Sequence, residues 1–170
     1  MKLMIASDIH GSAYYCNKML EAYKKEQADR LLLLGDILYH GPRNDLPREY
    51  NPKEVIAMLN PLKNELLCVR GNCDTEVDQM VLEFPILADY CYLAIGDCSI
   101  FATHGHIYNP QNLPPLKDGD ILLTGHTHIP ANQNLGRYTY MNPGSVSIPK
   151  DGSTRGYLVY DRTFTRKELE

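Results

Sequence analysis

The chain alternates short apolar runs with polar segments, and this pattern predicts a series of strands. The runs are LMIAS (3–7), LLLL (31–34), ELLCVR (65–70), ILLT (121–124) and RYTYM (137–141). Short runs of this kind are typical of strands in a buried sheet. CYLAI (91–95) and SIFAT (99–103) flank Gly96-Asp97, a turn signal that predicts a hairpin with a two-residue loop.

Helices are expected between the early strands. Residues 12–27 predict an amphipathic helix capped by Ser12, because apolar side chains recur at positions i, i+3, i+4 and i+7: Cys16, Met19, Leu20 and Tyr23. Residues 41–52 hold three prolines and are expected to form a loop, after which a short helix starts near Lys53. Thr75 is expected to cap another short helix that runs through Leu82. No element is assigned after residue 150.

The order of these elements predicts an α/β fold. Strands alternate with helices early in the chain and hairpins follow, which favours a mixed sheet, or two sheets packed together. No repeat, linker or low-complexity tract divides the sequence, so we expect one domain over residues 1–170.

The composition and net charge of the chain argue against nucleic acids and membranes as its main binding partners. Hydrophobic residues make up 44% and charged residues 22%, as in ordinary globular proteins. The net charge of −4 gives no electrostatic basis for binding a nucleic-acid duplex or an anionic membrane. The chain lacks an apolar run of transmembrane length, and the opening MKLMIASD reaches an acid too early for a signal peptide. We therefore expect a cytoplasmic protein.

The five cysteines are expected to be free thiols. Their number is odd, their spacings are irregular and no CxxC pair occurs. The predicted hairpin places Cys98 opposite Ile95 and Cys91 opposite Ala102, so these two cysteines do not face each other.

Polar residues of metal-binding type follow five of the predicted strands. They are Asp8 and His10, Asp36, Asn72, His104, and His126 with His128. Asp and Asn often terminate strands, but that habit does not explain three of six histidines at the same structural position. Ligands of α/β sheets bind beyond the carboxyl ends of the strands, so we expect these side chains to converge.

These residues sit in motifs that resemble a known family. DIHG, GDILYHGPRN, RGNCD, THGH and GHTH, in this order, are similar to the calcineurin-like metallophosphoesterases. GHTHIP followed by NPGSVSIPK narrows the resemblance to the YfcE-like bacterial phosphodiesterases. The resemblance covers roughly residues 2–150 and implies a four-layer α-β-β-α sandwich of two mixed sheets flanked by helices. It also makes a homodimer or homotetramer a reasonable expectation.

The resemblance implies a site for two divalent metal ions. Asp8, His10 and His128 would hold the first ion, Asn72, His104 and His126 the second, and Asp36 would bridge them. Mixed nitrogen and oxygen ligands suit manganese, our first choice, and also zinc, iron, nickel or cobalt. An HxH segment projects both imidazoles to one side if its backbone stays extended, so each could reach a different ion.

Two ions about 3.5–4 Å apart can share a hydroxide and clamp a phosphate. The resemblance therefore implies in-line attack of a bridging hydroxide on a small-molecule phosphodiester. Asp36, Asn72, His106 and Cys73 would take part in catalysis, and His40, Arg43 and Asn72 would bind substrate. Arg43 can donate two hydrogen bonds to a phosphate, but a plain surface arginine is an equal reading. Asp74 is expected behind the ligands, and Ser145 in a turn near them.

Cys73 stands where much of the wider family has a histidine thought to protonate the leaving group. A thiol, with a reference pKa of about 8.5, is a poorer proton relay at neutral pH than an imidazole. We interpret Cys73 as a pocket-lining residue and at most a weak acid.

Two other functions compete with a phosphodiesterase. One is a phosphomonoesterase of the same fold, and the other is a non-catalytic scaffold like the retromer subunit of this superfamily. The complete set of seven ligand residues speaks against a scaffold. An exonuclease of this superfamily would need further DNA-gripping domains, which neither the length nor the charge provides.

Overall fold

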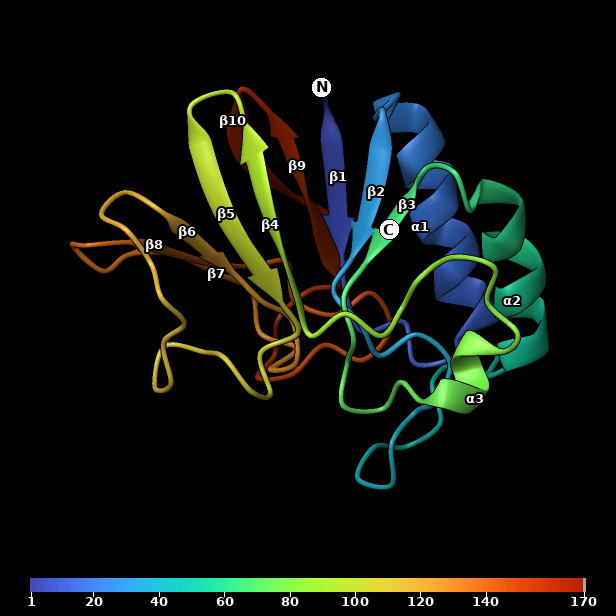
Figure 1. Cartoon of the computed structure of the whole chain (residues 1–170). Helices are drawn as coiled ribbons and strands as arrows, with labels where there is room; N and C mark the ends of the chain where they lie inside the picture. Colours follow the sequence, from blue (N-terminus) through green and yellow to red (C-terminus); the bar gives the residue numbers. More distant parts are fainter. Residues whose placement is uncertain (170) are drawn as a thin grey trace.

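The computed structural model describes residues 1–169 except the side chain of Cys98, and its strands form two mixed sheets packed face to face (Figure 1). The first sheet has the order β10-β9-β1-β2-β3, and the second has the order β4-β5-β6-β8-β7. The first consists of β1 (Leu3–Ala6), β2 (Arg30–Leu33), β3 (Leu66–Cys68), β9 (Gly156–Asp161) and β10 (Thr163–Glu168). The second consists of β4 (Tyr90–Ile95), β5 (Cys98–Thr103), β6 (Ile121–Leu123), β7 (Ala131–Asn134) and β8 (Thr139–Asn142).

Each sheet contains three neighbouring parallel strands, with antiparallel strands added at one side of the first sheet and at both sides of the second. β1, β2 and β3 are parallel neighbours in the first sheet, and β5, β6 and β8 are parallel neighbours in the second. Parallel strands deliver their carboxyl ends to one edge of a sheet. The arrowheads of β1, β2 and β5 accordingly point toward one group of loops at the lower end of Figure 1.

Three helices lie beside the first sheet. α1 (Ala13–Glu26) begins after Ser12, whose side chain accepts a hydrogen bond from the Tyr15 amide, as expected of its N-cap. α2 (Pro52–Leu59) continues into a 3-10 turn at Asn60–Leu62. α3 (Glu76–Gln79) has a capping box between Thr75 and Asp78. The helix ends at Gln79, before the expected end at Leu82. The Gln79 side chain donates hydrogen bonds to the carbonyl oxygens of Leu82 and Phe84 in the segment that follows.

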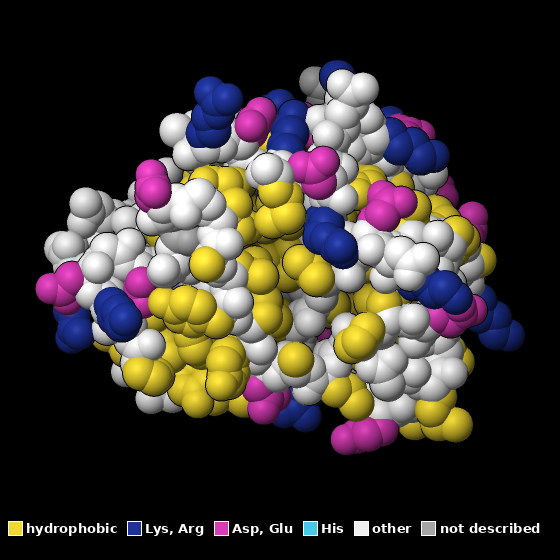
Figure 2. All heavy atoms as spheres, turned by 45° about the horizontal axis from the view of Figure 1, so that its top comes forward, with side chains coloured by type: hydrophobic (Ala, Val, Ile, Leu, Met, Phe, Trp, Pro, Cys, Tyr) yellow, Lys and Arg dark blue, Asp and Glu magenta, His cyan; other side chains and the backbone are white. Residues whose placement is uncertain are grey.

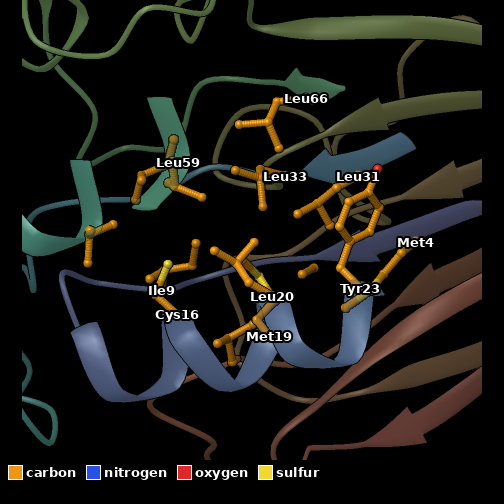
Figure 3. Packing of buried hydrophobic residues seen from close by; sticks show 14 of the residues in the cluster. Met4, Ile9, Cys16, Met19, Leu20, Tyr23, Leu31, Leu33, Leu59 and Leu66 are labelled. Carbon is orange, nitrogen blue, oxygen red and sulfur yellow. The ribbon is translucent and has the colours of Figure 1, made fainter. Parts of the chain in front are cut away.

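Two apolar layers hold these elements together. Between the helices and the first sheet, Figure 3 shows Met19, Leu20 and Tyr23 of α1 packed toward the sheet. Their neighbours in this layer include Met4, Leu31, Leu33, Leu59 and Leu66, all buried. The second layer lies between the sheets and joins Leu3, Ile5 and Leu32 to Ile100, Ala102 and Leu123.

The outer face of the second sheet has a different cover. Its aromatic cluster of Phe101, Tyr138 and Tyr140 packs against Tyr108 and Leu116, which belong to the loop after β5. The two mixed sheets and the flanking helices are as expected. Within residues 1–169, however, the layer over this second sheet is a loop rather than helices.

The hairpin, its register and the free thiols are confirmed where the structure describes them. Ile95 pairs with Cys98 and Cys91 pairs with Ala102 across β4 and β5. Cys16, Cys68, Cys73 and Cys91 are free, and the thiol of Cys98 lies outside the described atoms.

Three strands were not predicted. β7 (ANQN) is polar and largely exposed, so its sequence carries no apolar signal. β9 and β10 complete the first sheet next to β1 and fill the unassigned stretch after residue 150. No helix among the described residues is long and apolar enough to span a bilayer.

Candidate metal centre

The polar residues that follow the strands converge in the loops at one end of the molecule. Asp8 and His10 follow β1, Asp36 follows β2, Asn72 follows β3, His104 follows β5, and His126 and His128 follow β6. Figure 2 turns the opposite end of the molecule forward, and no histidine side chain is visible on that face.

Asp8, His10 and His128 form the first cluster of possible ligands. Their ligand atoms all lie within 4.8 Å of one another. His10 Nε2 is 3.2 Å from His128 Nε2, and Asp8 Oδ1 is 3.2 Å from His128 Nε2. All three side chains are buried. These are the three residues that the resemblance assigns to one ion.

Asn72, His104 and His126 form a second cluster, which is more open to solvent. His104 Nε2 lies 3.1 Å from Asn72 Oδ1 and 3.2 Å from His126 Nδ1. Asp36 lies between the clusters, because its Oδ2 is 3.4 Å from His104 Nε2 and 3.7 Å from His10 Nε2. Asp8, Asp36 and His104 also form a possible ligand group, so the two clusters are continuous.

The tautomers of three histidines are fixed by the backbone. Nδ1 of His10, His104 and His128 lies 2.8, 2.6 and 2.5 Å from the carbonyl oxygens of Tyr39, Leu34 and Ile148. A carbonyl only accepts hydrogen bonds, so each Nδ1 carries a proton and donates it. In the neutral rings, each Nε2 therefore directs a lone pair into the site, as metal-ligating histidines do.

The site has the properties of a cation-binding centre. Asp8 Oδ1 is buried yet accepts no hydrogen bond, although two imidazole nitrogens lie nearby. Carboxylate oxygens and imidazole lone pairs that face one another repel unless a cation lies between them. Nitrogen and oxygen ligands in this mixture fit a divalent transition-metal ion.

The backbone at the ligands is strained. Asp8, His10, Asp36, His126 and His128 all have φ between 49° and 67°. Residues with side chains enter this left-handed region at a cost of about 1–3 kcal/mol each, and such residues gather at functional sites. The expected extended backbone at His126 and His128 is therefore wrong. The two imidazoles still reach separate clusters, because left-handed turns aim them.

Glycines permit the close approach of these loops. A Cβ at Gly71 would lie 2.1 Å from Asp36 Oδ1, and a Cβ at Gly125 would lie 1.9 Å from Ser7 Oγ. Either substitution would push a ligand loop out of place.

Buried hydrogen bonds fix the loops behind the ligands. Asp74 accepts from the amides of Asp36, Ile37 and Gly71, at 2.8, 2.9 and 2.7 Å. Ser145 and Ser147 both donate to the carbonyl oxygen of Asp8. Asp74 was expected to lie behind the ligands, and these hydrogen bonds from three backbone amides agree with that position.

Asn142 and Ser147 were missed by the sequence reasoning. Asn142 donates to the carbonyl oxygen of Gly125 at 2.7 Å and so holds the loop that carries His126. Both residues belong to the stretch NPGSVS, which was noted only for its similarity to a family motif.

A small pocket of about 40 Å³ opens at the ligands, and its lining includes Cys73, Arg43 and Lys150. Cys73 Sγ lies within 4.8 Å of ligand atoms of His10 and Asp36. Burial and the carboxylate of Asp36 raise the pKa of the Cys73 thiol to about 12. Arg43 and Lys150 thus place two cationic side chains at the pocket lining, and Lys150 was not among the predicted residues. Binding of phosphate by Arg43 stays a prediction.

His106 and His40 lie beside the cluster rather than in it. The His106 ring is 5.4 Å from the His104 ring, its Nδ1 is buried without a partner, and desolvation lowers its pKa. His40 is absent from the pocket lining and packs edge-on against Tyr39 and Tyr50. Direct contact of His40 with substrate stays a prediction. In the structure its ring packs against the rings of Tyr39 and Tyr50 and supports their positions.

Comparison with known proteins identifies the family. A profile of the calcineurin-like phosphoesterase superfamily domain matches residues 1–163. The chain belongs to this superfamily, and it is a metal-dependent phosphoesterase.

Among individual proteins, it is 48% identical to phosphodiesterase YfcE of Escherichia coli K12 over 95% of this chain and 88% of that protein. The solved structure of E. coli YfcE superposes with a TM-score of 0.93 at 42% identity, covering both chains fully. Vps29 of Entamoeba histolytica has the same fold, with a TM-score of 0.63 at 19% identity over the whole of both chains.

The contacts of Asp74 give a first prediction. Asp74→Asn replaces one acceptor oxygen by a donor that faces backbone N–H groups, so the loops of Asp36 and Asn72 should separate. We expect the affinity for Mn²⁺ to fall about 10- to 100-fold, as for other residues that support metal ligands. Calorimetric titration would measure it, with the exposed Asp118→Asn as control. Unchanged affinity in Asp74→Asn would contradict this role.

The buried histidines give a prediction for the metal-free protein. Desolvation lowers the pKa of His104, but its hydrogen bond to Asp36 and the charges of Asp8 and Asp36 outweigh this and raise it to about 9. The pKa of His10 is raised as well. Because the pKa of His104 is higher in the folded than in the unfolded protein, its protonation stabilises the folded state. This contribution is complete below the unfolded-state pKa of about 6.5 and is lost as the pH rises to about 9. Thermal unfolding of chelated protein should therefore show a falling melting temperature across this window.

The same protons compete with metal. Apparent Mn²⁺ affinity should rise over the same pH window, because an ion that binds at His104 must displace the proton on that ring. His104→Asn should flatten the pH dependence of the unfolding temperature. A wild-type protein whose metal-free stability is constant from pH 6.5 to 9 would contradict the predicted coupling.

Proposed function

We propose that this protein is a binuclear metal-dependent phosphodiesterase. Asp8, His10 and His128 hold one ion, Asn72, His104 and His126 hold the other, and Asp36 bridges them. The supporting observation is the continuity of the two ligand clusters through Asp36 Oδ2. Bound there, two divalent ions would supply Lewis acidity and a hydroxide for in-line attack on phosphorus. Manganese remains our first choice among ions suited to nitrogen and oxygen ligands.

The charge of the site fits a diester. Two divalent ions, the carboxylates of Asp8 and Asp36, and one hydroxide would leave a single positive charge. A phosphodiester carries one negative charge and balances it, and a monoester dianion is also compatible with this site. Arg43 and Lys150 at the pocket lining add attraction for the phosphate oxygens.

The similarity to YfcE supports the same choice. That protein is named a phosphodiesterase, and it shares nearly half of its aligned residues with this chain. Vps29 of Entamoeba histolytica, at 19% identity, shows a likeness of fold alone. A cytoplasmic location and a homodimeric or homotetrameric state belong to the proposal as expectations.

Cys73 shapes the leaving-group requirement. Burial and the carboxylate of Asp36 raise the pKa of its thiol in the metal-free protein, and a thiol is in any case a poorer proton relay at neutral pH than an imidazole. Substrates whose leaving group is already acidic should be turned over best. Direct nucleophilic attack by Cys73 is not part of the proposal, because the hydroxide that the two ions would supply already fills the role of nucleophile.

Metal removal and restoration test the proposed function. Chelated protein should not hydrolyse an aryl phosphodiester, and Mn²⁺ should restore activity more fully than Zn²⁺, Fe²⁺, Ni²⁺ or Co²⁺. The aryl phosphodiester should exceed the matching monoester in kcat/KM. Asp36→Asn should stay inactive at every ion concentration, while the exposed Asp118→Asn should recover fully. A preference for the monoester would make this protein a phosphomonoesterase, and activity of the chelated protein would overturn metal dependence.

Cys73 variants test the leaving-group argument. Cys73→Ala should keep most activity on an activated aryl diester, within about threefold, because such a leaving group needs little protonation. Cys73→His should extend turnover to diesters with less acidic alcohols. Cys91→Ala, at a half-buried thiol on β4, is the matched control. Loss of nearly all activity in Cys73→Ala with both ions still bound would show that the thiol has an essential role.

A further inference from the structure

An apolar groove of about 360 Å³ adjoins the metal pocket. Cys73 lines both hollows, so the groove begins where the small pocket ends. Its other walls include Leu38, Tyr39, Tyr50, Ile56, Val77 and Val81. The metal pocket itself measures only about 40 Å³, far less than the groove.

The lining of the groove is mainly apolar, and its polar groups are the Tyr39, Tyr50 and Thr75 hydroxyls, the Cys73 thiol and the Asp78 carboxylate. Its one ionised lining residue, Asp78, already accepts hydrogen bonds from the Thr75 amide and hydroxyl in the capping box of α3. Val77 and Val81 are 69% and 44% exposed. Apolar side chains gathered around an exposed hollow commonly mark a binding site.

The walls of the groove are tied to the metal ligands. The carbonyl oxygen of Tyr39 accepts from His10 Nδ1, and its side chain lines the groove. The Tyr50 ring lies so close to Gly11 that a Cβ there would be 2.5 Å from Tyr50 Cε2. His40 packs against both tyrosine rings and so holds this wall in place.

A second hollow beside the ligands is more polar than the groove. It measures about 330 Å³, shares His126 with the metal pocket, and its lining includes His106, Gln111 and Gln133. A diester has two organic groups, and the two hollows differ in what they can bind. Burial of an apolar group is favourable in the groove, whereas the polar hollow offers hydrogen bonds.

We infer that the groove beside Cys73 binds an apolar alkyl or aryl ester group of the phosphodiester. The inference rests on the proposed function for the position of the phosphate. The substrate class is then a diester with at least one hydrophobic alcohol, and Val77 and Val81 set the preference for its length.

Binding of alkyl methylphosphonate monoesters tests this inference, because their unactivated alkoxide is a poor leaving group and turnover is slow compared with binding. These compounds carry one negative charge, as a phosphodiester does, and the ester chain can be lengthened from methyl to propyl to pentyl. Calorimetry on the manganese-loaded protein should show Kd falling about two- to fourfold for each methylene that enters the groove. A Kd independent of chain length, or no binding by any member, would overturn the inference.

Neutral polar substitutions locate the effect. Val77→Asn and Val81→Asn should flatten the dependence on chain length, because each puts an amide on the groove wall without changing the charge. Met80→Asn is the matched control, since Met80 lies between them, is 83% exposed and does not line the groove. A flattened series in Met80→Asn, or an unchanged series in both valine variants, would place the alkyl chain elsewhere.

Hydrolysis of the aryl diester, measured in parallel, separates the two proposals. If the diester is not hydrolysed but chain length still governs binding, the phosphodiesterase proposal fails and the groove assignment stands. If the diester is hydrolysed and the binding series is flat, the groove assignment fails alone.

Discussion

The site brings imidazole nitrogens and carboxylate oxygens together, and their lone pairs repel one another unless a cation lies between them. The rest of the structure must hold these groups in place against that repulsion. Hydrogen bonds to backbone carbonyls fix the protons of His10, His104 and His128 on Nδ1, so their Nε2 atoms face the carboxylates of Asp8 and Asp36. In a buried, low-dielectric place such groups repel strongly. The raised pKa of His104 reflects the same demand, since a proton provides the positive charge when no metal does.

The fold supplies the rigidity that this repulsion requires. Parallel strands in both sheets bring their carboxyl ends to one edge, and apolar packing between the sheets fixes those ends relative to each other. Asp74 then joins the loops after β2 and β3, and Ser145 and Ser147 join the loop after β1 to the one after β8. Ligands distant in sequence are thereby held together before any ion arrives.

Much of this arrangement was predictable from the sequence. Apolar runs marked the buried strands, and the residues after them marked the ligands, because a strand end fixes a position in space. The polar β7 gave no such mark, since an edge strand exposed to solvent needs no apolar side chains. The left-handed turns at His126 and His128 were also unpredictable, because backbone strain depends on neighbours that the local sequence does not contain.

The left-handed backbone at five ligand positions has an evolutionary consequence. A drifting lineage that no longer needed the reaction would gain robustness by replacing these residues with glycine or asparagine, which tolerate that conformation better. The chemistry of the side chains is then the only reason for aspartate and histidine at these sterically unfavourable positions. Relaxed selection should erase the ligand set first, while leaving the sandwich beneath it intact and available for other work.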